Sequence, residues 1–243
     1  MAGQLEFDAV WTRPTHPRRG LYFACKWALD TLIAGVGLVL LSPLMLAIAA
    51  LVRLDSPGLA IFKQERVGAK RRVEGGLEWW ELGTFTMYKF RTMYADADTR
   101  LHREYVRALI HDDQGKMTEL QGQETEVRKL VNDPRVTRVG RYLRRTSLDE
   151  LPQLWNVVKG EMSLVGPRPP LPYEVQEYRP WHRRRLAALP GCTGLWQVSA
   201  RDTVGFERMI ELDAWYIDHQ SLWLDLKILL RTPFVAFLGK GGL

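Results

Sequence analysis

One apolar run stands out in the pattern of hydrophobic and polar positions along this chain. Residues 31–52 are 22 consecutive positions without a charged side chain. As a helix they would extend ~33 Å at ~1.5 Å per residue, enough to cross a bilayer core of ~30 Å. The run starts late and lacks the cleavage pattern of a signal peptide. It therefore predicts a membrane-associated helix, which with its flanks covers residues 21–55.

The middle of this run contains Ser42 and Pro43, which should bend the helix. Pro43 has no N–H for the carbonyl of Val39 and its ring clashes there, while the Ser42 hydroxyl can bond a carbonyl one turn back. Basic residues, which favour the cytoplasmic side, stand on both sides of the run. We therefore predict a re-entrant helix–break–helix hairpin, with a kinked spanning helix and a buried core helix as alternatives. At its entry, Asp30 is expected to pair with a base such as Lys26, one turn back.

The pattern then changes to short stretches rich in β-branched and aromatic residues. Such runs in residues 60–93 predict a β-hairpin, with turns at Gly68 and at the Gly75-Gly76 pair. Residues 96–130 are charged and poor in proline, which indicates one or two solvated helices with a break near 112–115.

Two later segments have the composition of helices that lie on a lipid surface. Residues 178–189 combine Trp181 with a run of arginines, and residues 222–238 are apolar with a tryptophan and two basic residues. A solvated basic face and a helix that caps the core are the respective alternatives. The predicted fold class is α+β, mostly α, with a re-entrant membrane hairpin, a small β-hairpin and interfacial amphipathic helices. The predicted organisation is a basic segment 1–20, a re-entrant helix 21–55 and a compact cytosolic domain 56–243.

Composition narrows the class of partner. The 243 residues are 46% apolar and 26% charged, as expected for one globular domain with an anchor, and the net charge is +6. A basic balance favours anionic partners: nucleic acid, a phospholipid surface or phosphorylated substrates. Nucleic acid is disfavoured because an acidic pair interrupts the basic residues and an apolar hairpin precedes them. Cys25 and Cys192 lie far apart and match no metal spacing, so we interpret them as reduced thiols.

Candidate chemistry is concentrated where two carboxylates adjoin arginines. Asp149 and Glu150 directly follow a basic stretch that includes Arg144 and Arg145, and Arg168 stands in a stiff Gly-Pro-Arg-Pro turn. Paired acids can hold a hard cation and supply a nucleophile, while arginines hold phosphates. The pattern therefore indicates a metal-assisted reaction on a phosphate ester, although a surface turn explains Arg168 equally well.

A structural explanation of the acidic pair stays open beside the chemical one. Ser147 and Glu150 fit a Ser-x-x-Glu capping box, which would make both acids ordinary helix-start residues. Pro152 fits poorly inside such a helix and favours a start nearer Leu151. In both cases Asp149 lies at or just before a helix N-terminus, which favours its ionised form.

Two further basic residues flank an aromatic residue at the exit of the predicted hairpin. Alternation along a strand would place Lys89 and Arg91 on one face. Two interpretations of this pair remain: the residues bind a phosphate group, or they are ordinary exposed charges on a strand.

Taken together, these segments resemble the bacterial sugar transferases, the monotopic polyprenyl-phosphate phosphoglycosyl transferases. Five ordered motifs carry the resemblance, which runs from about Arg19 to the C-terminus: Ser42-Pro43, the segment 62–68 (Phe-Lys-Gln-Glu-Arg-Val-Gly), the segment 89–93 (Lys-Phe-Arg-Thr-Met), the segment 144–153 around Asp149-Glu150, and Gly166-Pro167-Arg168-Pro169. Residues 191–201 are similar to catalytic domains of larger members that start exopolysaccharide synthesis.

The resemblance implies a reaction and assigns roles within it. A sugar 1-phosphate would pass from a UDP-sugar, UDP-glucose or UDP-galactose by expectation, to undecaprenyl phosphate, with UMP leaving. Asp149 would be the nucleophile that forms a covalent phosphosugar intermediate, and Glu150 would help it hold Mg²⁺. The phosphates would be held by basic residues: Lys89, Arg91, Arg144, Arg145 and Arg168.

The resemblance also implies a place and partners for the protein. It predicts the bacterial inner membrane, with the catalytic domain facing the cytoplasm and contacting membrane lipids. A homodimer is left open. The competing functions are a phosphohydrolase of lipid-linked diphosphates and a non-catalytic membrane scaffold. The resemblance leaves the sugar undecided, because Ala200 stands where a glycine is common.

Overall fold

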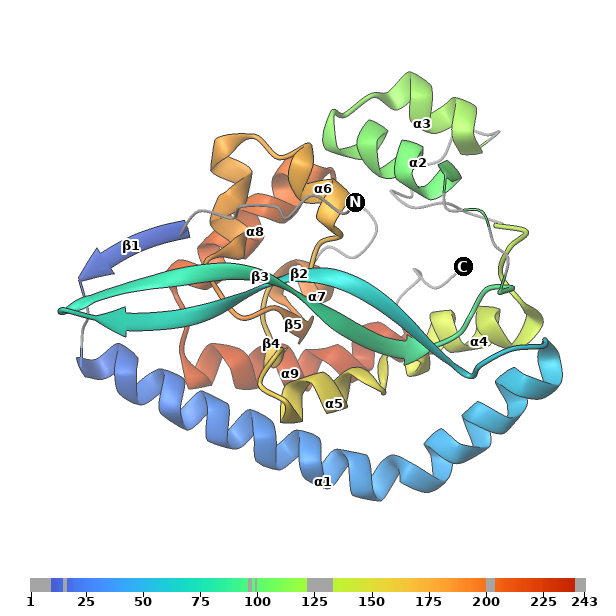
Figure 1. Ribbon diagram of the computed structural model, residues 1–243, viewed down its shortest axis with the longest axis horizontal. Helices are drawn as coiled ribbons and strands as arrows, with labels where there is room; N and C mark the ends of the chain where they lie inside the picture. The colour runs from blue at the N-terminus through green and yellow to red at the C-terminus, as the bar shows by residue number, and fades with distance from the viewer. Residues whose placement is uncertain are drawn as a thin grey trace.

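The computed structural model describes residues 10–14, 17–95, 98, 100–121, 133–199 and 204–238. In chain order its elements are β1 (Val10–Pro14), α1 (Pro17–Asp55), β2 (Ile61–Glu74), β3 (Leu77–Phe90), α2 (Arg100–Ile110), α3 (Gln114–Gln121), α4 (Arg138–Thr146), the 3₁₀ helix η1 (Leu148–Glu150), α5 (Gln153–Val158), β4 (Ser163–Val165), α6 (Pro172–Gln176), the 3₁₀ helix η2 (Pro180–Leu186), β5 (Gly191–Thr193), α7 (Leu195–Ser199), α8 (Phe206–Asp218) and α9 (Leu222–Leu238). One sheet is antiparallel with the order β1-β3-β2, and β4 and β5 form a parallel pair. The predicted α+β class, mostly helical with a small sheet, is confirmed (Figure 1).

The apolar run forms the long helix α1, which follows one edge of the molecule and bends near its middle (Figure 1). The Ser42 hydroxyl donates to the carbonyl of Val39 at 2.8 Å, as predicted. Pro43 lies inside the helix, so the expected break into two helices is corrected to a bend within one. Helical bonds on both sides of the proline continue the helix, and the serine hydroxyl satisfies a carbonyl that the proline cannot reach.

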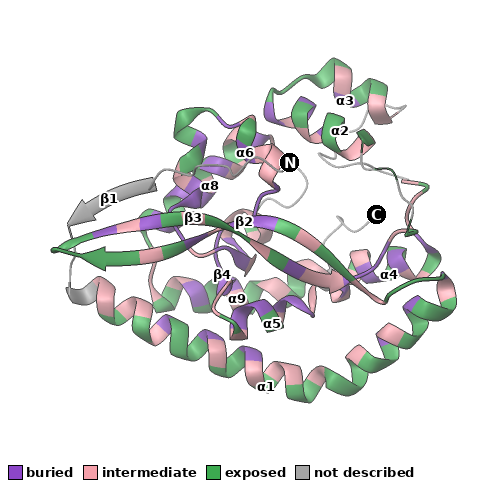
Figure 2. Ribbon diagram, viewed as in Figure 1, coloured by how far each residue is buried: buried purple, intermediate pink, exposed green. Residues whose placement is uncertain are grey.

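The apolar surface of α1 is largely unburied. In the most apolar 18-residue window of this helix, mean hydropathy is 2.5 and only 11% of the window is buried. Val39, Leu40 and Leu46 are each more than 70% exposed, and most of α1 has the colours of exposed or intermediate residues in Figure 2. A soluble core helix would bury these side chains, so the buried-core alternative is wrong.

The helix also begins earlier than predicted. It starts at Pro17, four residues before the expected start at 21. Part of the predicted basic segment 1–20 forms β1, which pairs with β3, while residues 1–9 and 15–16 lie outside the described residues.

The predicted hairpin is present within residues 60–93. Strands β2 and β3 have 14 residues each and pair along their whole length. Gly75 and Gly76 form the turn with φ of +58° and +79°, the left-handed values that a two-residue hairpin loop requires. The turn predicted at Gly68 is wrong, because Gly68 pairs with Gly83 inside the sheet. A Cβ at Gly68 would lie 2.9 Å from the ring of Phe85, so this glycine permits a close approach instead.

The predicted helix pair in residues 96–130 is confirmed where it is described. Helix α2 ends at Ile110 and α3 begins at Gln114, with Asp112 between them at φ 53°. Residues 122–130 lie outside the described residues.

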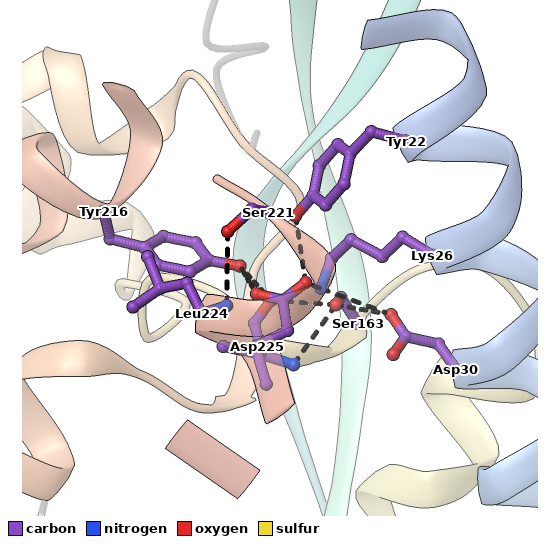
Figure 3. A network of polar contacts seen from close by, with 9 residues as sticks. Tyr22, Lys26, Asp30, Ser163, Tyr216, Ser221, Leu224 and Asp225 are labelled. Atoms are coloured by element: carbon purple, nitrogen blue, oxygen red, sulfur yellow. Dashed lines mark hydrogen bonds and ion pairs between the residues drawn. The ribbon is translucent and has the colours of Figure 1, made fainter. Parts of the chain in front are cut away.

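A buried polar network fastens the first half of α1 to the rest of the chain (Figure 3). The Lys26 ammonium lies 2.8 Å from Asp225 on α9 and 3.7 Å from Asp30, which confirms the predicted Lys26–Asp30 pair. Asp30 in turn accepts a 2.6 Å hydrogen bond from Ser163 on β4. Asp225 also accepts hydrogen bonds from two tyrosine hydroxyls, Tyr216 at 2.7 Å and Tyr22 at 3.0 Å.

The two segments predicted to lie on a lipid surface differ in the structure. Arg185 of η2 is buried and pairs with Asp213 at 2.8 Å, so a headgroup role for this arginine is wrong. Helix α9 buries Asp225 and Ile228 on one side, while its opposite side exposes an apolar stripe: Trp223, Leu226, Leu230 and Phe234. This helix therefore covers the core and also presents an apolar face.

Candidate functional site

The acidic pair lies in η1, between α4 and α5. Helix α4 ends at Thr146, and its C-cap residue Ser147 has a left-handed φ of 57° that turns the chain sharply. The Ser147 side chain makes no cap hydrogen bond, so the capping box does not form. Pro152 is the N-cap residue of α5, as the alternative start nearer Leu151 required. Asp149 and Glu150 thus lie on a tight connection immediately before a short helix.

Helix α5 is fixed against the hairpin by the buried Asn156. Its side-chain nitrogen donates to the carbonyl of Thr86 at 2.7 Å, and its oxygen accepts from the N–H of Tyr88 at 3.1 Å. Both partners are on β3, whose next residue is Lys89. The amide therefore holds the acidic connection next to the strand that carries this lysine.

Three of the predicted basic residues surround Asp149. The positive charges of Lys89, Arg144 and Arg168 all act on its carboxyl group. The Arg168 guanidinium donates to Glu150 at 3.0 Å, and that of Arg144 donates to the Thr92 hydroxyl at 2.9 Å. These three residues come from β3, α4 and the turn after β4, so the fold assembles a basic group around the acidic pair.

The other two predicted basic residues lie elsewhere. The Arg91 guanidinium is buried at the end of α1, where it donates to the carbonyls of Ser56 at 2.8 Å and of Pro57 at 2.5 Å. Arg91 therefore fixes the turn that follows α1, and it also reaches the carbonyl of Val52 in the last turn of the helix at 3.5 Å. Arg145 is exposed on α4. The structure does not bring either guanidinium to Asp149.

Burial shifts the pKa values of the central groups toward neutrality. Burial, and then the charge of Glu150, raise the pKa of Asp149 to about 6, although the surrounding cations oppose the shift. Burial, and then the charge of Arg66, lower the pKa of Lys89 to about 7. Asp149 is thus largely ionised at neutral pH and remains poorly solvated, which suits a nucleophile.

Two charged residues near the site were not selected from the sequence. Arg66 on β2 donates to the carbonyl of Pro169 at 2.8 Å, and the adjacent N–H of Val67 donates to Pro170 at 2.9 Å. These bonds fasten the Arg168 turn to the hairpin. Glu174 on α6 lies near Arg66 and Arg168. Arg66 lies in the segment 62–68, one of the motifs that carry the resemblance, so the sequence contained a signal that could have identified it. Nothing in the sequence singled out Glu174.

A cavity of about 390 Å³ adjoins these groups. Its polar wall contains Glu150, Arg168, Arg66 and Glu174, while α2, α8 and α9 supply apolar residues such as Val106, Phe206 and Val235. This size and mixed lining fit a small polar molecule that carries an anionic group.

The acidic pair also fits a Mg²⁺ ion. Among the described residues no cluster of three or more His, Cys, Asp or Glu side chains is present, so a site built wholly from protein ligands is not found there. Mg²⁺ commonly takes only one or two carboxylates and completes its shell with water and substrate phosphates. Asp149 and Glu150 supply such a pair beside a cavity whose wall contains Arg66 and Arg168.

Comparison with known proteins gives consistent matches. The family model described as bacterial sugar transferase matches residues 21–239. Similar proteins include the UDP-galactose-lipid carrier transferase of Erwinia amylovora, 40% identical over 84% of this chain and 38% of the relative. The undecaprenyl-phosphate galactose phosphotransferase of Salmonella typhimurium is 38% identical over 89% of this chain and 41% of its own length. The exopolysaccharide production protein ExoY of Rhizobium meliloti is 39% identical, over 89% of this chain and 87% of its own length. The chain therefore spans less than half of the first two relatives and most of the third.

Proposed function

The chain belongs to the bacterial sugar transferase family, and from this premise we propose that it is a polyprenyl-phosphate phosphoglycosyl transferase. It transfers a sugar 1-phosphate from a UDP-sugar to undecaprenyl phosphate and releases UMP. The observation that carries this proposal is the pair of buried Asp149 and half-buried Glu150, with the positive charges of Lys89, Arg144 and Arg168 acting on Asp149. Names of relatives support the two substrates, since one is a UDP-galactose-lipid carrier transferase and another an undecaprenyl-phosphate phosphotransferase. UDP-galactose and UDP-glucose are the proposed donors.

The proposed chemistry has two steps at one carboxylate. An oxygen of ionised Asp149 attacks the β-phosphorus, the bond from that phosphorus to the oxygen bridging the two phosphates breaks, and UMP leaves. An oxygen of the polyprenyl phosphate then attacks the same phosphorus and releases the Asp149 carboxylate. Arg168 and Arg144 hold the phosphate oxygens, and protonated Lys89 offsets the negative charge that develops. A Mg²⁺ ion held by Asp149 and Glu150 would neutralise diphosphate charge.

The exposed helix α1 supports a membrane location for this chemistry. One substrate is soluble and the other is lipid-linked, so the site has to lie at the membrane surface. The unburied apolar side of α1 and the apolar stripe of α9 supply a surface that a membrane would cover. We propose that α1 is re-entrant in the inner membrane, with both of its ends and the catalytic domain in the cytoplasm. Tags at the two termini should both be accessible from the cytosol, and a tag protected at one end would refute this topology.

The central experiment measures UMP release from a panel of UDP-sugars. The wild-type protein and Asp149→Asn are compared with and without undecaprenyl phosphate and Mg²⁺. A surface carboxylate, Asp218, supplies the matched control Asp218→Asn. We expect release that depends on the lipid acceptor, persists in the control and disappears in Asp149→Asn. With acceptor omitted, intact-mass analysis should show the wild-type chain heavier by one sugar phosphate.

The other outcomes separate the alternatives. Sugar phosphate liberated into water without an acceptor would indicate a phosphohydrolase, and no turnover with any donor would favour a scaffold. Full activity in Asp149→Asn would remove Asp149 as the nucleophile.

A further inference from the structure

We propose that Glu174 is a specificity-determining residue of the cavity, whose carboxylate accepts hydrogen bonds from hydroxyl groups of the sugar-nucleotide donor. This inference rests on the proposed function and extends it to the part of the donor beyond its phosphates. The hydroxyls belong either to the transferred sugar or to the ribose of the nucleotide.

The first argument is position. Glu174 lies on α6, a few residues after Arg168, and lines the same cavity as Glu150 and Arg168. The charge of Glu174 acts on Arg66, Arg168 and Arg185. A sugar-nucleotide donor whose phosphate groups bind Arg168 would therefore place its adjoining hydroxyl groups close to Glu174 in this cavity.

The second argument is that the neighbouring cations are engaged elsewhere. Arg168 pairs with Glu150 at 3.0 Å, Arg185 pairs with Asp213 at 2.8 Å, and Arg66 donates to Gln64 at 2.7 Å. Among the described residues, no ion pair within 4.0 Å includes Glu174. Apart from a backbone hydrogen bond at Leu171, its oxygens keep acceptor capacity for a ligand.

The third argument is chemical. A carboxylate repels phosphate oxygens, so its presence beside a phosphate-binding arginine does not serve phosphate binding. An ionised carboxylate is an acceptor only, and hydroxyl groups are the donors that a sugar nucleotide offers in greatest number. Burial raises the pKa of Glu174, while the charges of Arg66, Arg185 and Arg168 oppose the rise and favour its ionised form.

Other polar groups on the same cavity fit this interpretation. The hydroxyls of Thr193 and Thr232 lie 2.9 Å apart on the cavity wall. The side-chain oxygen of Gln197, also a lining residue, is buried and has no hydrogen-bond partner within the described part of the chain. Hydroxyl recognition at Glu174 would thus occur in a wall that already contains several neutral polar groups.

The test combines variants of Glu174 with donors that lack single hydroxyls. Full-length protein in lipid nanodiscs is assayed for kcat and KM with UDP-galactose, UDP-glucose, donors deoxygenated on the hexose and donors deoxygenated on the ribose. Glu174→Ala should lower kcat/KM about tenfold to a hundredfold, the range for a hydrogen bond to a charged group. Glu174→Gln keeps an acceptor and should recover much of this loss. The control is Glu211→Ala, since Glu211 is exposed on α8 and pairs with Arg208.

The donor analogues give the decisive comparison. Removing the hydroxyl that Glu174 binds should impair the wild type and leave Glu174→Ala nearly unchanged; the position of that hydroxyl identifies hexose or ribose as its source. Equal losses in wild type and variant for every analogue would overturn the inference. If Glu174→Ala does not fold, as shown by its thermal unfolding, Glu174→Met, which keeps most of the side-chain volume but has no strong acceptor, takes its place in the same comparison. Absence of turnover in the wild type would instead refute the proposed function itself.

Discussion

The buried pair between Lys26 and Asp225 gives a prediction whose size follows from the structure (Figure 3). The two side chains are 6% and 8% exposed, and the ammonium nitrogen lies 2.8 Å from the carboxylate. Lys26→Met would leave Asp225 and Asp30 buried without this cation. Removing one partner of a buried pair costs about 3–5 kcal/mol. We expect the lower end, about 3 kcal/mol, because Asp225 keeps its hydrogen bonds from two tyrosine hydroxyls.

The assay is thermal unfolding in detergent, followed by circular dichroism. For a chain of this size about 1 kcal/mol corresponds to ~2–4 °C, so Lys26→Met should lower Tm by about 6–12 °C. The control is Lys159→Met, which removes an exposed lysine paired with Glu161 and should change Tm by less than about 2 °C.

A double-mutant cycle then tests the cause. Asp225→Asn keeps an acceptor for the tyrosines but removes the charge, so Lys26→Met/Asp225→Asn should be less destabilised than the sum of the single variants. A small effect of Lys26→Met, or strictly additive single effects, would refute the claim that this pair is electrostatically coupled and shielded from water.

Two further predictions concern activity. The pKa of Asp149, about 6, and that of Lys89, about 7, predict a bell-shaped pH profile of kcat/KM. The value of kcat/KM should fall about tenfold per pH unit below pH 6, where Asp149 takes up a proton, and should also fall above pH 7, where Lys89 loses one. Lys89→Arg should abolish only the fall at alkaline pH. If that fall is unchanged in the variant, Lys89 is not its origin. Arg168→Gln should lower kcat/KM about tenfold to a hundredfold, whereas Arg145→Gln should stay within about twofold, and equal losses would contradict the assignment of their positions.

Local patterns in the sequence were sufficient for the elements that depend on near neighbours. The 22-residue uncharged run specified the long apolar helix, Ser42 and Pro43 specified its bend, and Gly75-Gly76 specified the hairpin turn. Each of these features follows from steric limits or hydrogen bonding within a few residues. The re-entrant topology stays a prediction, since a membrane decides it.

The sequence predicted only part of the candidate site. The acidic pair and the positions of Lys89, Arg144 and Arg168 followed from motifs. The turn predicted at Gly68 was wrong, and the Arg91 guanidinium is engaged after the end of α1, because the partners of both residues are distant in the chain: Arg91 donates to the carbonyl of Ser56, and Gly68 lies against Phe85 on the neighbouring strand.

The sequence by itself determined which charged groups and which apolar helix the protein has. Only the tertiary structure decided which of those charges act on Asp149 and which form structural ion pairs, such as that between Arg185 and Asp213. It also placed Glu174 in the cavity and joined α1 to α9 through Lys26 and Asp225. The physical reason is that burial and proximity set the pKa and the partner of a charged group, and both arise from packing between segments far apart in the chain.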